Sequence, residues 1–466
     1  MLFSSLEFLV LFLPLTLAVS LRLHGQPLLR WIALASIVFY AFAGHWWFIV
    51  PMIVTTVVDY WMAILIDGEP RAERRRGLLA VSLIGNLGML AYFKYSGLMV
   101  RTAEQGLALI GLGGSAMSFR WSEVVLPAGI SFYTFQTLSY IIDVWRRQAP
   151  AERNFARFLG FISFFPHLVA GPLTRHHQLI PQLARIAETG ITPRWREGIL
   201  LFCVGLCKKV LIADRLGNLI DPMLGVPLHL DLVSGWLALL GYAFQIYFDF
   251  SGYSDMAIGL GRLFGIELPQ NFNSPYKAQS PSEFWRRWHM TLSFWLRDYL
   301  YITLGGNRCS AGRRRFNVMA TMILGGLWHG ANWTFAAWGT WHGLLLVLHQ
   351  ALPAWETALS RFWQRNLTFL LVTVGWVFFR AESFLQAGQW LASLGGAYGV
   401  IPAWSPDSGR LLALVLGCFV IVRACPNSME LPLGRLGRLP QVGLGAATAA
   451  SVLLMNYGSK FLYFQF

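Results

Sequence analysis

Charged residues are scarce along this chain. Of its 466 residues only 13% are Asp, Glu, Lys or Arg, while 55% are hydrophobic, and a soluble domain carries charge on about a quarter of its residues. These proportions exclude a soluble multidomain enzyme. At about 20 residues for each crossing, roughly half of the chain could form about 11 to 13 transmembrane helices. We therefore predict an all-α polytopic membrane protein.

The net charge of +14 comes from basic residues that are grouped in short loops. In a soluble chain this charge would suggest a nucleic-acid partner, but the positive-inside rule explains it in a membrane protein, and we expect no nucleic acid to bind. The loops expected on the cytoplasmic side carry Arg71 with Arg74–Arg76, Arg146 with Arg147, Arg153 and Arg157, and Arg308 with Arg313, Arg314 and Arg315. The five cysteines form no CxxC pair, so neither a disulfide framework nor a metal site is expected.

We expect residues 1–466 to form a single integral membrane domain. Its parts are N-terminal helices in 1–150, a core in 151–350, and C-terminal helices with an aromatic tail on the outer side in 351–466. Residues 5–22 are expected to be a retained first helix, and 31–66 two short helices interrupted near Gly44 and Pro51. In the core, Pro, Gly, Asn and charged residues repeatedly break the apolar runs. Non-helical backbone at membrane depth must be buried or line a watery cavity, so we predict a central tunnel there.

The stretch 283–302 has the periodicity of one amphipathic helix. It would place apolar residues on one stripe and Arg286, His289, Ser293 and Arg297 together on another side. Two interpretations stay open. The helix lies at the membrane interface with its arginines at lipid headgroups, or its polar side is a wall of the tunnel that contacts an anionic group.

His329 ends an uncharged run that begins at Phe316 and is followed by Gly330, Ala331 and Asn332. Ionisable groups inside membranes are costly and mark functional sites, so we predict a neutral imidazole acting as a base; the alternative is a core histidine. His342 follows thirteen residues later, which is about 220° around one continuous helix. We therefore predict a structural role for His342.

Two acidic residues and a glycine-rich segment give weaker signals. Asp249 and Asp255 are six residues apart and would not share a helical face. We expect them to be structural or to line the cavity. The segment GLGRLFG, 259–265, follows no strand, so small-residue packing between helices is expected rather than dinucleotide binding.

Three long motifs carry a resemblance to a known family. They are YFDFSGYSDMAIGLG, NFNSPYKAQSPSEFWRRWH and LGGLWHGANW, and the stretch FFPHLVAGPLTR around His167 adds to them. These stretches resemble the membrane-bound O-acyltransferase (MBOAT) family, and in particular its bacterial branch that O-acetylates alginate and cellulose. The resemblance implies helices around a thin centre where a funnel and a tunnel meet. It also implies that His329 and His289 are the family's two site histidines.

The resemblance further implies transfer of an acyl group from a cytoplasmic thioester to a hydroxyl. No cofactor would be bound permanently, and acetyl-CoA or another acetyl thioester would be the donor substrate. Four arginines would contact the phosphates of the donor, namely Arg308, Arg313, Arg314 and Arg315.

The reacting groups would lie farther inside. The residues expected to line the tunnel are Arg286, Ser293, Arg297, Asn332 and Tyr463. His329 would act as the base, and either His289 or Asn332 would stabilise the oxyanion.

The segment FLYF, Phe461–Phe464, resembles the ending of a small partner peptide in the related D-alanyl transferase system. One hypothesis is that Tyr463 folds into the funnel and receives or guides the acyl group. The alternative is an aromatic anchor at the membrane surface.

The function expected from these features is O-acetylation of an exopolysaccharide across a bacterial inner membrane, with periplasmic acetyltransferases as partners. Because no long soluble insertion precedes the last helix, cellulose is slightly favoured over alginate. The alternatives are an acyltransferase that acts on a lipid or teichoic-acid-like acceptor, and a transporter with intramembrane histidines.

Overall fold

The computed structural model describes residues 1–111, 124–225, 228–352, 354–401, 405–455 and 462. Throughout these ranges the regular elements are helices, which confirms the all-α prediction. Two compact units are formed, one by Met1–Ile199 with Ala257–Pro269 and the other by Leu200–Met256 with Gln270–Phe466.

Most helices of the first unit come from the N-terminal part of the chain. They are η1 (Phe8–Phe12), α1 (Leu13–Ser20), α2 (Gly25–Ala41), η2 (Trp46–Phe48), α3 (Ile49–Gly68), α4 (Ala72–Leu90), η3 (Ala91–Tyr95), α5 (Ser96–Leu109), α6 (Ile130–Trp145), α7 (Phe155–Ser163), α8 (Phe165–Leu168) and α9 (His176–Thr189). The long helices α10 (Trp195–Cys207) and α12 (Leu232–Leu263) have residues in both units.

The second unit contains the remaining helices. They are η5 (Lys208–Ala213), α11 (Asp214–Ile220), η6 (Asp221–Leu224), η7 (Pro275–Lys277), α13 (Pro281–Arg287), α14 (Met290–Trp295), η8 (Leu296–Tyr301), α15 (Ala311–His329), α16 (Trp333–Ala351), α17 (Ala354–Ala358), α18 (Arg361–Arg380), α19 (Phe384–Leu394), α20 (Pro406–Ala424), η9 (Leu433–Arg435) and α21 (Arg438–Leu454).

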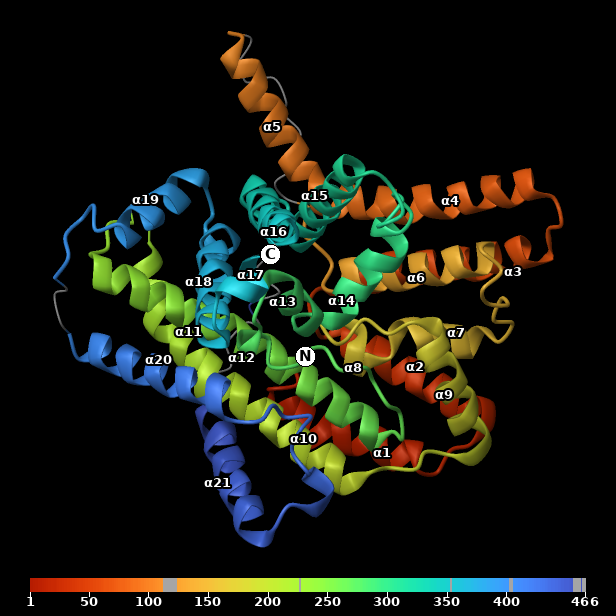
Figure 1. Ribbon diagram of the computed structural model, residues 1–466. Helices are drawn as coiled ribbons and strands as arrows, with labels where there is room; N and C mark the ends of the chain where they lie inside the picture. The colour runs from red at the N-terminus through yellow and green to blue at the C-terminus, as the bar shows by residue number, and fades with distance from the viewer. Residues whose placement is uncertain (112–123, 226–227, 353, 402–404, 456–461, 463–466) are drawn as a thin grey trace. The chain divides into compact units, whose positions relative to one another are not determined.

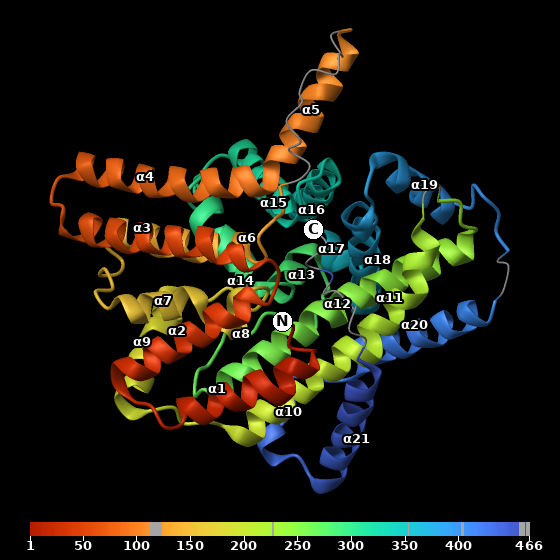
Figure 2. The same cartoon turned by 180° about the vertical axis from the view of Figure 1, so that it is seen from behind.

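In the first unit, α3 and α4 lie side by side (Figures 1 and 2). The buried carboxylate of Asp59 on α3 accepts hydrogen bonds from Ser82 Oγ at 2.5 Å and Asn86 Nδ2 at 2.7 Å on α4. Thr137 Oγ1 on α6 donates to Asn86 Oδ1 at 3.1 Å. A buried carboxylate is tolerated only when such partners replace water, so this polar cluster fixes how the three helices pack.

Two helical stretches of the described residues are long and apolar enough to cross a membrane, Trp46–Gly68 and Ala72–Leu109. The α3 helix exposes an apolar stripe with helical spacing, formed by Val50, Val54, Val58, Trp61 and Leu65. Such an outward-facing stripe suits contact with lipid. Two stretches are fewer than the roughly 11 to 13 crossings estimated from composition, and the further crossings stay a prediction.

The interruption expected in 31–66 is present near Gly44. Helix α2 ends at Ala41 and α3 begins at Ile49. A Cβ on Gly44 would lie 2.8 Å from the Phe48 ring, so a larger residue there would have to displace this buried ring. Pro51 does not break the chain, because it lies in the first turn of α3, where the missing N–H has no helical partner.

Glycines allow close contact between helix backbones. In the second unit, a Cβ on Gly326 of α15 would lie 2.3 Å from the Phe335 carbonyl oxygen, and one on Gly339 of α16 would lie 2.3 Å from the Met322 carbonyl oxygen. In the first unit, a Cβ on Gly198 would lie 2.9 Å from the Gly259 carbonyl oxygen. The small-residue packing predicted for the segment that begins at Gly259 is therefore confirmed.

The contact between α15 and α16 predicts that Gly339→Ala lowers the stability of the folded protein. The added methyl group meets backbone atoms, which cannot rotate away, so the helices must separate at a cost of about 1 to 3 kcal/mol. Thermal unfolding in detergent measures this loss. The matched control is Gly417→Ala in α20, where a Cβ would meet nothing within 4 Å, and which we expect to leave stability unchanged or to raise it by about 0.5 to 1 kcal/mol. Equal effects at both sites would contradict the packing argument.

Candidate active site

The backbone breaks at Trp288 and His289, so the prediction of one helix over 283–302 was wrong. Helix α13 ends at Arg287, Trp288 is extended, and His289 adopts the left-handed conformation with φ of 43°. Left-handed backbone is unfavourable for a residue with a Cβ. The surrounding chain holds it in place: Met290 N–H donates to the Asn271 carbonyl oxygen at 2.9 Å. Such strain, imposed by neighbours, is typical of functional sites.

The side chain of Asn271 orients the His289 ring. His289 is fully buried, and its Nδ1 lies 3.2 Å from Asn271 Oδ1. Thr291 Oγ1 donates to the same oxygen at 2.9 Å, while Asn271 Nδ2 donates to Ser254 Oγ at 3.3 Å. Because Oδ1 can only accept, the proton of a neutral His289 is assigned to Nδ1. The lone pair then lies on Nε2.

The ring of His329 lies beside that of His289. Their centroids are 6.2 Å apart, and only 4% of His329 is exposed. Three aromatic rings surround His329, with centroid distances of 5.0 Å to Trp328, 5.1 Å to Trp338 and 5.3 Å to Phe379. The structure thus brings together the two histidines that the sequence analysis singled out, in a buried aromatic cluster of the second unit.

The turn after His329 explains why Gly330 and Asn332 follow it. Helix α15 ends at His329, and a Cβ on Gly330 would lie 2.0 Å from the Phe335 ring. Asn332 caps α16, because its Oδ1 accepts from Thr334 N–H at 3.3 Å and its Nδ2 donates to the Glu382 carbonyl oxygen at 2.8 Å. Asn332 therefore holds the turn that positions His329.

The break in the helix separates two of the three residues expected beside His289 from its ring. Arg286 and Arg297 are exposed, whereas His289 is buried. Arg297 pairs with Asp298 at 2.6 Å, and Ser293 Oγ donates to the Trp288 carbonyl oxygen at 3.2 Å. The two arginines do not share a face with His289, and the shared polar face predicted for 283–302 is therefore wrong.

The arginine cluster and His329 lie at opposite ends of α15. Arg313, Arg314 and Arg315 lie in its first turns, Arg308 precedes it, and His329 is its last residue. Eighteen steps of 1.5 Å separate the first residue of the helix from His329 along the axis, or about 27 Å. Positive charge at a helix N-terminus opposes the helix dipole, so this end of α15 favours an anionic partner.

The four arginines expected to contact phosphates are not equally accessible. Arg308, Arg313 and Arg315 are exposed, as a surface contact requires, whereas Arg314 is only half-exposed. The Nε atom of Arg314 is buried and has no hydrogen-bond partner among the described residues. The guanidinium of Arg314 is therefore less open to a phosphate than those of the other three. Contact of the four arginines with phosphates stays a prediction.

His342 is closer to the site than its sequence spacing indicated. The assumption of one continuous helix was wrong, because α15 ends at His329 and α16 starts at Trp333. The Trp338 ring contacts both histidines, with its centroid 5.1 Å from that of His329 and 4.9 Å from that of His342. His342 is fully buried, and within the described residues neither ring nitrogen has a hydrogen-bond partner.

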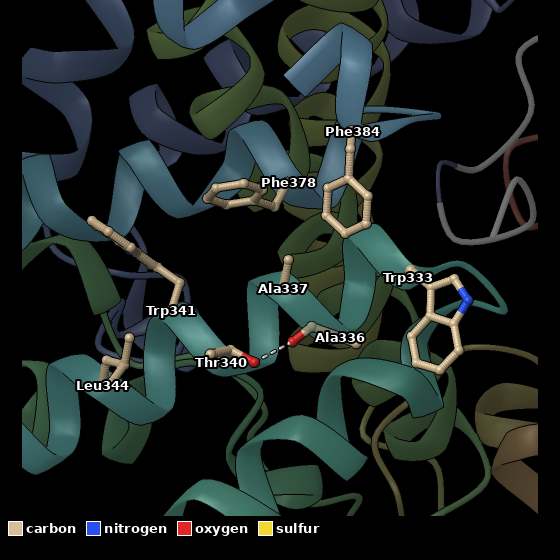
Figure 3. A pocket seen from close by; sticks show the side chains of 8 residues that line it. All are labelled: Trp333, Ala336, Ala337, Thr340, Trp341, Leu344, Phe378 and Phe384. Atoms are coloured by element: carbon tan, nitrogen blue, oxygen red, sulfur yellow. Dashed lines mark hydrogen bonds between the residues drawn. The ribbon is translucent and has the colours of Figure 1, made fainter. Parts of the chain in front are cut away.

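Another side of α16 forms an apolar groove (Figure 3). It is lined by Trp333, Ala336, Ala337, Thr340, Trp341, Leu344, Phe378 and Phe384. Thr340 Oγ1 donates to the Ala336 carbonyl oxygen at 2.9 Å, so the hydroxyl is already satisfied. These lining residues include no acid or base. The groove therefore does not supply the chemistry.

The predicted and the observed site differ at three residues. Tyr463 lies outside the described residues. Asn271 and Trp338 were not identified from the sequence. Asn271 belongs to the segment NFNSPY, whose polar residues between apolar ones were a usable signal, but the partner of its amide could not be known before the chain was folded.

Comparison with known proteins identifies the family. The profile of the MBOAT, membrane-bound O-acyltransferase family, matches residues 146–379, which include both histidines of the candidate site. The chain belongs to this family. Membership confirms the predictions of an O-acyltransferase and of a membrane protein.

Relatives of this family member cover most of its length. The protein called "Probable alginate O-acetylase AlgI" of Pseudomonas putida is 43% identical over the whole of both chains. The protein of the same name from Azotobacter vinelandii is also 43% identical, over 84% of this chain and 78% of its own. A peptidoglycan O-acetyltransferase of Helicobacter pylori is 36% identical over 79% of this chain and 74% of its own.

The orientation of His289 predicts that Asn271→Ala lowers acyl transfer by about 10-fold or more, as loss of an orienting partner does at other histidine sites. The variant removes the acceptor for His289 Nδ1 and for Thr291, so the ring can turn. Turnover of an acyl thioester by protein in detergent measures the effect. Gln270→Ala is the matched control, because Gln270 donates to the Phe272 carbonyl oxygen. Full activity of Asn271→Ala would contradict the orienting role.

Proposed function

We propose that this protein O-acetylates an exopolysaccharide, using acetyl groups from a cytoplasmic thioester that are moved across a bacterial inner membrane. The observation that carries the proposal is the pair of buried imidazoles, His289 and His329, with ring centroids 6.2 Å apart. The alginate O-acetylase relatives favour alginate over cellulose as the acceptor. Periplasmic acetyltransferases remain the expected partners because the polymer is modified outside the cell.

The proposed reaction needs one base and one group that stabilises negative charge. His329 removes the proton of the acceptor hydroxyl as the oxygen attacks the thioester carbonyl, and general-base help of this kind contributes about 10² to 10⁴ in rate. The carbon–sulfur bond then breaks, and the thiolate takes the proton back from His329. No proton is gained or lost overall, so the site needs no external proton donor.

The orientation of His289 limits its role. When neutral, with its proton on Nδ1 and a bond to Asn271, it presents a lone pair at Nε2 and can accept a hydrogen bond from the hydroxyl or from protonated His329. It can stabilise the oxyanion through Nε2 only when protonated. Asn332 is the alternative donor, through the amide hydrogen that is not directed at Glu382.

The donor is proposed to be acetyl-CoA or another acetyl thioester, which arrives at the cytoplasmic end of α15. The exposed Arg308, Arg313 and Arg315 would bind its phosphates directly, and the half-exposed Arg314 would add positive charge behind them. Since His329 is about 27 Å farther along the same helix, the donor must be elongated, with its thioester end extending inward.

The two arginines near His289 would act at the surface. Arg286 and Arg297 are exposed on the helical segments on either side of the break at His289. They would therefore contact anionic groups outside the site, such as lipid headgroups, rather than the reacting atoms.

The base assignment predicts that His329→Ala lowers acetyl-CoA turnover by about 10² to 10⁴. Two quantities are measured on purified protein in liposomes. One is the release of free CoA from radiolabelled acetyl-CoA, and the other is the amount of acetate bound to the polymer. His349→Ala is the control, because His349 on α16 instead contacts Ser282 Oγ, 3.2 Å from its Nδ1. A folded His329→Ala protein that still turns over the thioester would refute the assignment. Acetyl transport without CoA release would favour the transporter.

The segment around Tyr463 provides a separate prediction about the path of the acyl group. If the Tyr463 hydroxyl receives or guides it, Tyr463→Phe abolishes acetylation of the polymer, while the ring that could anchor the segment at the membrane surface is kept. Mass spectrometry of the polymer measures acetate per sugar. Unchanged acetylation in Tyr463→Phe would eliminate the carrier role and leave the anchor interpretation.

A further inference from the structure

A groove between α2 and α7 of the first unit has a polar end and an apolar end. The two helices lie side by side (Figures 1 and 2), and the groove between them has a volume of about 430 Å³. Its α2 side is a stripe with helical spacing, formed by Gln26, Arg30, Ala33, Leu34 and Ile37. Polar side chains therefore line the beginning of the stripe, and apolar side chains line the remainder.

The polar groups at the beginning of the stripe are available to a ligand. Gln26 and Arg30 are exposed, and within the described part of the chain neither side chain forms a hydrogen bond or an ion pair. Arg157 on α7 differs, because it pairs with Glu152 at 3.1 Å. An unpaired guanidinium at the edge of a groove can bind a phosphate through charge-assisted hydrogen bonds.

The direction of α7 places Asn154 at the same end of the groove. Phe165, two residues after α7, donates from its N–H to Ser36 Oγ on α2 at 3.0 Å, so α7 ends beside the later turns of α2. The first residues of α7 and Asn154 before them also line the groove, and they therefore lie toward Arg30. Asn154 Oδ1 accepts from Arg157 N–H at 3.1 Å, so Nδ2 can still donate to a bound group.

The rest of the groove suits an acyl chain. Ala33, Leu34 and Ile37 on α2 and Leu159 on α7 line it, and 54% of Leu34 is exposed. Seven helical steps of 1.5 Å separate Arg30 from Ile37, or about 10 Å along the axis. This length fits within one leaflet, which is half of a hydrocarbon core of about 30 Å.

Charge favours an anionic lipid over a neutral one. Arg153, which directly precedes Asn154, is also exposed and belongs to a loop expected on the cytoplasmic side. Anionic lipids give this face of a membrane a negative surface potential, and basic pockets between helices bind their headgroups. The apolar groove of α16 has no charged lining residue and so offers a phosphate no such partner.

We propose that the groove between α2 and α7 is a binding site for a phospholipid with an anionic headgroup. Arg30 contacts the phosphate, Gln26 and Asn154 donate to other headgroup oxygens, and one acyl chain lies along the apolar part of the stripe. Because the lipid binds only when the two helices are packed, it stabilises the folded first unit. The site shares no residue with the candidate active site and does not depend on the proposed function.

Photo-crosslinking tests the site on the full-length protein in nanodiscs. Phosphatidylglycerol with a diazirine in one acyl chain is mixed at a low fraction into phosphatidylcholine, and labelled peptides are identified by mass spectrometry. We expect label within residues 26–37, and about 5-fold less of it in Arg30→Gln, which lacks one basic contact to the anionic lipid. Equal labelling of Arg30→Gln and the unaltered protein would overturn the proposal.

Arg22→Gln is the matched control. It removes the same charge from an exposed arginine that donates to the Ala18 carbonyl oxygen and does not line the groove. We expect this variant to be labelled like the unaltered protein. Equal losses of label in Arg22→Gln and Arg30→Gln would show a general effect of charge and would contradict a site at Arg30.

Two further comparisons separate the parts of the ligand. Photoreactive phosphatidylcholine has the same chain and phosphate but no net charge, and we expect it to label residues 26–37 about 5-fold less than phosphatidylglycerol does. Equal labelling by the two lipids would refute the preference for an anionic headgroup. An excess of inorganic phosphate is expected to leave the labelling unchanged, whereas loss of label would indicate a site for free phosphate and overturn the assignment to a lipid.

Discussion

The close backbone contact between α15 and α16 is the constraint on which the site depends. Gly326 and Gly339 each face a carbonyl oxygen of the opposite helix at a distance that excludes a Cβ. This contact fixes the short turn after His329 and places Trp338 of α16 against the His329 ring. His289 reaches the same cluster from a different segment, through a left-handed backbone conformation held by the chain at Asn271. Neither histidine could be placed by its own helix alone.

Several buried polar side chains bind one another in small groups. Asp59 binds Ser82 and Asn86, Lys209 binds two aspartates, and Asn271 binds His289 and Thr291. Unpaired polar groups are costly in an apolar medium, so these sets determine which faces of the helices meet. An imidazole with one nitrogen already bound offers only the other for chemistry.

The sequence predicted the helical class, the break near Gly44 and the family, and it singled out the two histidines that the structure brings together, because each rests on local patterns or long motifs. It could not predict the break at His289, since the 3.6-residue periodicity of 283–302 continues through it, and only the contacts with Asn271 reveal it. The position of His342 was misjudged because the turn at Gly330 changes the helix direction. The pairing of Asp249 with Lys209 joins residues forty positions apart, and such contacts leave no local signal.

The central claim is that the acyl thioester meets its acceptor at the His289–His329 pair. An experimental structure with a non-hydrolysable ketone analogue of acetyl-CoA tests it most directly. The account predicts that the analogue's carbonyl lies within hydrogen-bonding reach of the two imidazoles, about 3 Å, while its phosphates lie at the arginine end of α15. A carbonyl bound in the apolar groove of α16, or left at the arginine end, would contradict it.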